Sequence, residues 1–257
     1  MDRPTGASER AGAGPANPPT PTAEPRQRWR IAFARDAPSD RPHRETADEW
    51  IAGLQQCGLP LPRTDGRPRP PLVFAAPLPV GVGAQRELAD MWLARRLPLA
   101  DVREALVRAM PSDLRLIDLH DVWLGTPALA AALVAADYRV MPTGDAPAPG
   151  ELAAAAQRLL ASPSLERQRS RGGGTVRYDL RPLVEAIVVE PGPPPAIRIR
   201  TRFHPERGAG RPEEVLAALG ELLGRPIVAS ATVRERLILE GDDQDSAVAA
   251  STRRPRK

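Results

Sequence analysis

The sequence predicts an α+β fold made of two ferredoxin-like units, each with the element order strand–helix–strand–strand–helix–strand. Two observations support this prediction. Segments with an apolar period of two alternate with segments of helical period, and between Arg28 and Gly241 their order repeats the six-element series twice. In such a unit, two helices cover one face of a four-stranded antiparallel sheet. We therefore expect two sheets with a cleft between them.

The predicted ordered part covers residues 28–241, divided into a first unit at 28–124 and a second unit at 125–241. Residues 1–27 are rich in Pro, Gly, Ala, Ser and Thr, and they contain no aromatic residue. This segment and residues 242–257 cannot bury enough apolar surface to offset chain entropy, so both are predicted to be disordered tails.

The first unit opens with a strand at residues 28–34, where Trp29, Ile31 and Phe33 alternate with charged or small residues. A helix follows. It has a capping box formed by Thr46 and Glu49, an apolar face that includes Cys57, and a stop at Gly58. Cys57 is predicted to be a core residue rather than a nucleophile. The unit is completed by strands at residues 72–78 and 87–95, a helix at 99–110 and a strand at 114–124.

The second unit contains the helix with the clearest local signals, at residues 212–223. Pro212 occupies its first position, acidic residues fill its first turn, and Gly224 follows its end. The strand at residues 176–190 is predicted to be bent or interrupted at Pro182. The other elements are predicted as a strand at 138–141, a helix at 150–161, an Arg- and Gly-rich loop at 166–174, and strands at 197–203 and 232–240.

Composition narrows the classes of function. The net charge is only +4 although the pI is about 10.1, so a basic surface has to be a local patch. The single cysteine excludes an internal disulfide, a four-thiolate zinc site and a three-cysteine iron–sulfur site within this chain. His43, His120 and His204 are isolated from one another, so no metal site is predicted. Asp118 and His120 share one face of a strand, without further ligands beside them.

No N-terminal segment has the layout of a signal peptide, and the longest charge-free apolar run, at residues 122–136, contains Gly125 and Pro127. This run is too short to span a bilayer. The sequence therefore predicts a cytoplasmic protein without a membrane partner.

Arginines alternate with apolar residues on the strand at residues 197–203, and a similar alternation recurs in the last strand. Because side chains alternate between the faces of a sheet, we expect five guanidinium groups on one open face. Like charges across strands are unfavourable, so carboxylates such as Glu185 and Glu235, water or an anionic ligand must compensate them. Two alternatives remain open: a solvated outer face, or a surface for a phosphate-bearing partner such as RNA. This face lacks the stacking aromatics of RNA-recognition sheets. The candidate contacts are Arg198, Arg200, Arg202, Arg234 and Arg236.

A second group of arginines flanks three glycines at residues 172–174. No Lys-Ser/Thr follows these glycines, so they do not form a phosphate-binding P-loop. The arginines either wrap a phosphate as an added clamp or stay solvated. They are Arg167, Arg169, Arg171 and Arg177.

Several short motifs, taken in their order along residues 28–241, resemble the DUF2344 family, also called radical-SAM-linked or radical-SAM-associated proteins. The first unit keeps only His43 of the family's Ser-His-Leu-Asp element, and it lacks the Phe and Asn of a Gly-Phe-Asn-Pro-Arg-Pro stretch. The motif segments of the first unit are residues 30–33 and 57–60, Arg67-Pro68-Arg69-Pro70, residues 74–82, and Glu87 with Asp90. Those of the second unit are residues 178–182 with Asp179 and Arg181, residues 211–216 and residues 234–236.

The resemblance implies an accessory role, because such domains occur fused to, or encoded beside, cobalamin-binding radical-SAM proteins. It implies that this chain binds no cofactor itself, and that a radical-SAM partner carries the iron–sulfur cluster, the SAM and the cobalamin. The leading hypothesis is a non-catalytic module that presents RNA or another anionic substrate.

Two further hypotheses stay open. The chain could be a protein–protein adaptor that docks through its Pro-rich apolar segment at residues 70–82. It could also be a stand-alone enzyme that uses His43, Asp90, Asp179 and Arg181, although no nucleophile–base pair is visible among them.

Overall fold

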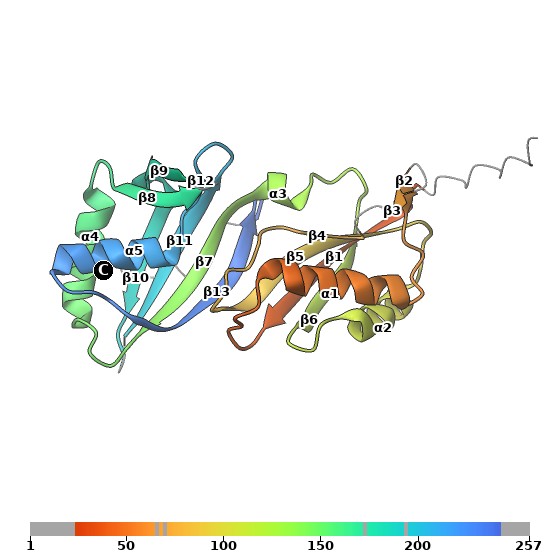
Figure 1. Ribbon diagram of the computed structural model, residues 1–257, viewed down its shortest axis with the longest axis horizontal. Coiled ribbons are helices and arrows are strands. Elements are labelled where there is room, and N and C mark those ends of the chain that lie inside the picture. The colour runs from red at the N-terminus through yellow and green to blue at the C-terminus, as the bar shows by residue number, and fades with distance from the viewer. Residues whose placement is uncertain (1–23, 65–66, 69–70, 172–173, 193–194, 243–257) are drawn as a thin grey trace, which may run out of the picture.

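The computed structural model describes residues 24–64, 67–68, 71–171, 174–192 and 195–242 (Figure 1). Apart from residues 24–27 and Asp242, the two predicted tails lie outside these ranges. The described residues form a mixed α+β structure with a large, mostly antiparallel sheet and five α-helices, which confirms the predicted class.

The first half of the chain contributes four strands and two covering helices. Its strands are hydrogen-bonded in the order β6-β1-β5, with the short β4 on the other side of β5, and every pair is antiparallel. The elements are β1 (Gln27–Arg35), α1 (His43–Gln56), β4 (Leu72–Phe74), β5 (Val82–Leu93), α2 (Leu99–Ala109) and β6 (Arg115–Val122).

The second half has the spatial order β10-β11-β7-β13, again with antiparallel pairs. Its main elements are β7 (Leu133–Pro142), α4 (Pro149–Ala161), β10 (Val184–Glu190), β11 (Ala196–His204), α5 (Pro212–Leu223) and β13 (Ala229–Leu239). Smaller elements are β2 (Arg63–Thr64), β3 (Arg67–Pro68), α3 (Leu129–Ala132), β8 (Glu166–Arg171), β9 (Gly174–Asp179), the 3-10 turn η1 (Arg181–Leu183) and β12 (Gly208–Ala209).

The two halves share one continuous nine-stranded sheet, so the expectation of two sheets separated by a cleft is wrong. β4 pairs only with residues 89–91 of β5, which leaves the start of β5 without a partner on that side. Unpaired backbone groups at a sheet edge need hydrogen bonds. Here β13 supplies them by running parallel to β5, from Thr232 opposite Val82 to Arg234 opposite Ala84.

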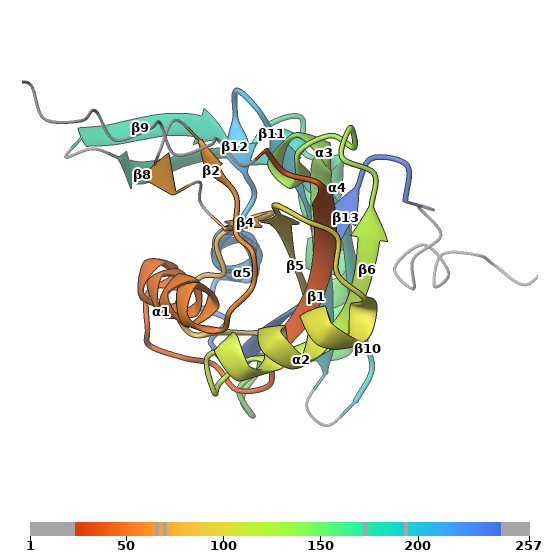
Figure 2. The ribbon, with the colours of Figure 1, turned by 90° about the vertical axis from the view of Figure 1, so that its right-hand side faces the viewer.

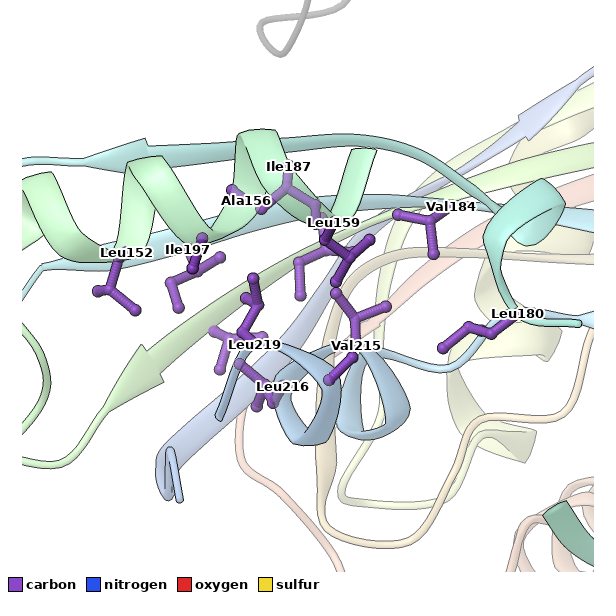
Figure 3. Close-up of a cluster of buried hydrophobic side chains, with 14 of the residues drawn as sticks. Leu152, Ala156, Leu159, Leu180, Val184, Ile187, Ile197, Val215, Leu216 and Leu219 are labelled. Atoms are coloured by element: carbon purple, nitrogen blue, oxygen red, sulfur yellow. The ribbon is translucent and has the colours of Figure 1, made fainter. Parts of the chain in front are cut away.

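Three large apolar clusters, and a smaller one of Leu78, Val82 and Ala84, stabilise this arrangement. In the first half, Trp50 and Leu54 of α1 pack with Leu106 of α2 over β1. Viewed along the long axis, α1 and α5 lie on the same side of the sheet (Figure 2). In the second half, Leu159 of α4 and Leu219 of α5 meet above β11 (Figure 3). Each buried Leu side chain contributes about 1.5–3 kcal/mol.

The third cluster joins the halves. It combines Ala32 and Leu88 of the first half with Tyr138 and Leu237 of the second, together with Leu129 of α3. Because both halves contribute to one cluster, their junction is packed.

Several element boundaries differ from the predictions for local reasons. The prediction of a capping box at Thr46 and Glu49 is wrong. The helix α1 begins at His43, with Pro42 at its N-cap and no side-chain capping hydrogen bond. Thr46 is instead buried, and its hydroxyl accepts a hydrogen bond from Arg35 at 2.8 Å.

The Arg- and Gly-rich segment predicted as a loop contains the antiparallel hairpin of β8 and β9. The interruption at Pro182 is confirmed, since η1 separates β9 from β10. The helix α5 is confirmed, with Gly224 in the left-handed conformation at φ 68°. Among the described residues, no helix combines the length and the apolar character needed to cross a membrane.

Candidate functional site

The alternation predicted for β11 is present, and carboxylates neutralise its arginines. Arg200 is buried and donates two hydrogen bonds to Asp137, from Nε to Oδ1 at 2.7 Å and from Nη2 to Oδ2 at 2.9 Å. Arg198 donates from Nη2 to Glu235 at 2.7 Å, and Arg202 lies 2.9 Å from Glu185. Of the compensating groups that the sequence left open, the structure uses Glu185 and Glu235.

Arg234 does not share this face, so the prediction of five guanidinium groups on one open face is wrong. A β-bulge in β13 places Arg234 opposite Tyr138 but Arg236 opposite Asp137, so two residues of β13 stand against one residue of β7. A bulge of this kind reverses the alternation. Arg236 stays on the open face, 3.1 Å from Asp137, while Arg234 turns to the face that the helices cover.

On the covered face, Arg234 forms a buried ion pair with Glu87 across the junction of the two halves. Both side chains are 2% exposed. Arg234 donates from Nε to Oε1 of Glu87 at 2.6 Å and from Nη2 to Oε2, and its Nη1 donates to the carbonyl of Pro77 at 3.1 Å. Burial by itself would lower the pKa of Arg234, but the Glu87 carboxylate raises it above the ordinary value.

Two further titratable groups, His43 and Tyr138, lie near the Arg234–Glu87 pair. His43 lies at the start of α1, where its Nδ1 accepts a hydrogen bond from the Leu78 amide at 3.4 Å. Burial, followed by the positive charges of Arg234 and Arg35, lowers the pKa of His43. Burial raises the pKa of Tyr138. At neutral pH the imidazole of His43 is therefore uncharged and the phenol of Tyr138 keeps its proton.

A pocket of about 330 Å³ opens beside Arg234 and Tyr138 at the junction. It is lined by Ala76, Pro77 and Pro79 from the segment before β5, and by Arg211, Pro212 and Glu213 at the start of α5. Three of the segments that carry the family resemblance, at residues 74–82, 211–216 and 234–236, therefore meet here although they are distant in the sequence.

A second pocket of about 630 Å³ shares Arg211 with the first and extends along the β8–β9 hairpin. Its other lining residues include Arg169, Arg177, Tyr178 and Arg207, together with the carboxylates of Asp179 and Glu206. We call the two pockets together the junction groove.

The junction groove carries positive charge that acidic residues compensate only in part. Within the described ranges, no carboxylate lies within ion-pair distance of the exposed Arg177 and Arg207, and Arg211 is 3.9 Å from Glu213. Arg169 is more strongly held. It donates to Glu214 at 3.2 Å, and its guanidinium lies 4.0 Å from the centroid of the Tyr178 ring.

The other arginines of the predicted clamp differ in role. Arg167 donates to Glu221 of α5 at 2.8 Å, which ties the hairpin to that helix. The side chain of Arg171 lies outside the described part of the structure. Among the clamp arginines whose side chains the structure describes, Arg177 is the one without a carboxylate partner. Arg207 and Arg211 join it from the segment between β11 and α5.

The four residues of the stand-alone enzyme hypothesis do not meet in one pocket. Asp90 lies on the open face, where it binds Arg28 and Arg30. Asp179 accepts hydrogen bonds from the amides of Leu165 at 2.7 Å and Arg181 at 2.9 Å. These contacts give Asp90 and Asp179 structural roles.

Arg181 donates to the carbonyls of Leu160 and Val184 at 2.6 Å and 2.7 Å, which satisfies the end of α4. His43 begins α1 and lies near the Arg234–Glu87 pair, whereas Asp179 ends β9 and Arg181 begins η1. The geometry therefore does not support acid–base catalysis by this set of residues.

The remaining predicted positions fall on structural or undescribed parts of the chain. The Arg67 and Pro68 backbone forms β3, while Arg69 and Pro70 lie outside the described residues. Cys57 is half-buried and packs against the first-half core. His120 lies 3.4 Å from Asp118 on the exposed face of β6, and the described residues contain no group of three potential metal ligands.

About half of the Pro-rich segment of the adaptor hypothesis is buried. Leu72, Ala75, Ala76, Leu78 and Val82 are all buried. Val73 and Val80 are its exposed large apolar side chains. Together with the exposed Pro77 and Pro79, they make up the apolar surface that this segment offers for docking.

Sequence reasoning missed Arg207, Arg211 and Tyr178 as groove residues. Arg211 belongs to a family-motif segment, which was an available signal. Tyr178 also belongs to such a segment, at residues 178–182. Arg207 had no distinctive local pattern, because a turn after β11 brings it beside the hairpin strand only in three dimensions.

A family model described as "Uncharacterized protein conserved in bacteria (DUF2344)" matches residues 30–211. No curated protein is significantly similar to the sequence. Among solved structures, a chain in "Crystal Structure of a Cbf5-Nop10-Gar1 Complex" aligns with a TM-score of 0.43 at 11% identity, over 80% of this chain and 49% of that chain.

A chain in "Crystal structure of the archaeal box H/ACA sRNP Nop10-Cbf5 complex" aligns with a TM-score of 0.41 at 11% identity, over 82% of this chain and 50% of that chain. The protein thus spans about half the length of the chains it matches. A likeness at these TM-scores carries no functional argument.

Proposed function

This chain belongs to the DUF2344 family, and we propose that it is a non-catalytic accessory module of a radical-SAM enzyme system that holds a phosphate-bearing substrate, such as RNA, in its junction groove. The observation that carries the proposal is the free positive charge of the groove. Arg177, Arg207 and Arg211 are exposed there with little carboxylate compensation, whereas acidic neighbours neutralise the sheet arginines.

The chemistry of arginine fits this role. A guanidinium group presents several N–H donors in a planar fork, which matches phosphate oxygens. Three such groups around a pocket can bind a backbone phosphate by charge and hydrogen bonding without any catalytic group nearby. The ring of Tyr178, on which the Arg169 guanidinium stacks, also lines this pocket.

The radical-SAM half of the proposal rests on the family resemblance. With one cysteine in the chain, a cluster that needs three thiolates has to come from a partner. The partner would supply the iron–sulfur cluster, SAM and cobalamin, and this chain would position the substrate.

We also propose that the two halves are copies of one ferredoxin-like unit. Strand order supports this, since each half places its first strand between its third and fourth, with the second strand beside the third. Fusion through β5 and β13 would then have created the pocket beside Arg234, which residues of both halves line.

Binding to bulk tRNA tests the substrate half. We expect the triple variant Arg177→Ala/Arg207→Ala/Arg211→Ala to bind more weakly, with a shallower dependence of log affinity on log salt. Each lost phosphate contact reduces that slope by roughly 0.7–0.9, so the loss should be about 2–3 in all.

A matched control removes the same charge from the open face. Arg86, Arg139 and Arg202 are 46%, 45% and 58% exposed and are paired with carboxylates. Their triple Ala variant should keep the wild-type slope. Equal losses in both variants, or no tRNA binding by the wild-type protein at low salt, would contradict the groove assignment.

Co-purification tests the partner half. We expect a radical-SAM subunit to remain bound to the full-length chain after nuclease treatment, and to bind the groove variant equally well. Retention that disappears with nuclease would mean that nucleic acid alone bridges the two proteins.

A further inference from the structure

A single tryptophan stands out on the surface at the far edge of the sheet from β10. Trp123, directly after β6, is 80% exposed, more than any other large apolar side chain in the described ranges. By contrast, Trp29 and Trp50 are buried in the first-half core. Tryptophan is enriched at binding interfaces, because its ring combines a large apolar surface with an N–H donor.

The turn that carries Trp123 is held in place. A Cβ atom at Gly125 would lie 2.4 Å from the Trp123 ring, so the indole lies directly against that glycine. The Thr126 amide donates to the Trp123 carbonyl at 3.0 Å. The buried Arg28 donates to the carbonyls of Thr126 and Pro127. The ring is therefore presented on a rigid support.

Cations without carboxylate partners lie beside this ring. Trp123, Arg26 and Arg96 line one pocket of about 380 Å³. Both arginines are exposed, and no acidic group of the described chain lies within ion-pair distance of either. The one carboxylate in the pocket, Asp121, accepts a hydrogen bond from Gln27 at 3.0 Å.

We infer that this pocket binds a nucleotide unit, with the base stacked on Trp123 and the phosphate held by Arg26 and Arg96. Base stacking on an aromatic side chain tolerates any base, because every base has a π face. A guanidinium binds phosphate through several parallel hydrogen bonds. The second oxygen of Asp121 is free to accept from an exocyclic amino group of the base.

The inference goes beyond the proposed function, since this pocket belongs to the first half and shares no residue with the junction groove. The ligand has two sources, a free nucleotide or one residue of a single strand. Both present the same base and phosphate, and the experiment separates them.

The test titrates the full-length protein with AMP and, separately, with a 12-nucleotide oligo(A) RNA, by following tryptophan fluorescence and by calorimetry. Trp123→Ala should weaken binding roughly 5- to 160-fold, the range that corresponds to one stacked base. Trp123→Phe should recover part of the loss. The control Val107→Ala, at another exposed apolar position, should bind as the wild type does.

The phosphate contacts are tested with Arg26→Ala/Arg96→Ala. For the oligonucleotide, the slope of log affinity against log salt should fall by about 1.4, whereas Arg44→Ala/Arg103→Ala on α1 and α2 should leave it unchanged. Saturable AMP binding identifies a free-nucleotide site, and binding of the oligonucleotide alone identifies a single-strand site. Either result supports the inference.

Binding of neither probe would overturn the inference, as would equal binding by Trp123→Ala and the wild type. Loss of a protein partner from Trp123→Ala with unchanged nucleotide binding would also overturn it, and would identify a protein-docking residue. The groove triple variant should retain AMP binding, so failure here is distinguishable from failure of the proposed function.

Discussion

Breaking the Arg234–Glu87 pair should destabilise the protein more than any exposed ion pair, because it leaves one charge buried alone. We consider Glu87→Leu, which removes both hydrogen bonds from the guanidinium to the carboxylate and leaves it with uncharged partners, the Pro77 carbonyl and the Tyr138 hydroxyl. The buried charge of Arg234 cannot be removed by deprotonation, because the pKa of an arginine lies far above the pH range of the experiment. The loss in free energy of unfolding should be about 3–5 kcal/mol.

The reverse substitution, Arg234→Met, should cost a similar amount at neutral pH but less at low pH. It leaves the Glu87 carboxylate buried and unpaired, and burial raises a carboxyl pKa. Glu87 can therefore take up a proton as the pH falls, which removes the buried charge. The penalty of Glu87→Leu should not relax in this way between pH 7 and pH 5.

The double variant Glu87→Leu/Arg234→Met decides between an ion-pair effect and a packing effect. If the losses were independent, the double variant would lose about 6–10 kcal/mol, the sum of the single losses. We expect a loss of about 2 kcal/mol or less, because apolar replacement of both partners is often neutral.

The assay is urea unfolding followed by circular dichroism, with midpoints and slopes determined for all variants. Arg108→Ala, which removes an exposed pair with Glu104 on α2, should cost under about 0.5 kcal/mol. Additive single losses, or single losses near 1 kcal/mol, would refute the account of the junction.

Three other predictions concern the core, one helix end and one histidine. Leu106→Ala should lower the free energy of unfolding by about 2–5 kcal/mol, because Leu106 is fully buried. Val107→Ala, on the exposed side of the same helix, should change it by under about 0.5 kcal/mol. Urea unfolding compares the two variants, and equal effects would contradict the core assignment. Gly224→Ala should lower the free energy of unfolding by about 1–2 kcal/mol through backbone strain alone, because the φ of Gly224 is 68° and no atom crowds the position. An unchanged melting temperature would show that the helix end rearranges. The pKa of His43 is lower in the folded protein than the ordinary 6.5. The contribution of His43 to stability is therefore complete above pH 6.5 and is lost as the pH falls from about 7 towards the folded pKa. Unfolding of His43→Gln should depend less on pH over this range, and an unchanged profile would assign the dependence to other groups.

Local signals were sufficient for much of the secondary structure. The helix α5 matches its prediction because Pro212, the acidic first turn and Gly224 act within a few residues of each helix end. The side-chain alternation on β11 also follows from the strand period alone. The capping box failed because the hydroxyl of Thr46 bonds to Arg35 in β1, a partner that no local pattern reveals.

The candidate site could be predicted only in part. Alternation correctly grouped Arg198, Arg200 and Arg202, but it could not show that Asp137, which belongs to a different strand, would neutralise Arg200 and Arg236. It also placed Arg234 on the wrong face, because the bulge beside it depends on how β13 pairs with β7.

The sequence by itself determined the α+β class, the amphipathic helices and the family, since these depend on periodicity and on motifs that act over short stretches. Only the tertiary structure decided that the halves share one sheet, that Arg234 is buried against Glu87, and that Arg177, Arg207 and Arg211 face a common groove. The groove depends on the β8–β9 hairpin lying beside the turn after β11. For the shared sheet and the buried ion pair, the physical reason is that strand pairing across the junction joins segments about 150 residues apart, as the separation of 147 between Arg234 and Glu87 illustrates. The register of that pairing sets which side chains are buried and which remain free to bind a ligand.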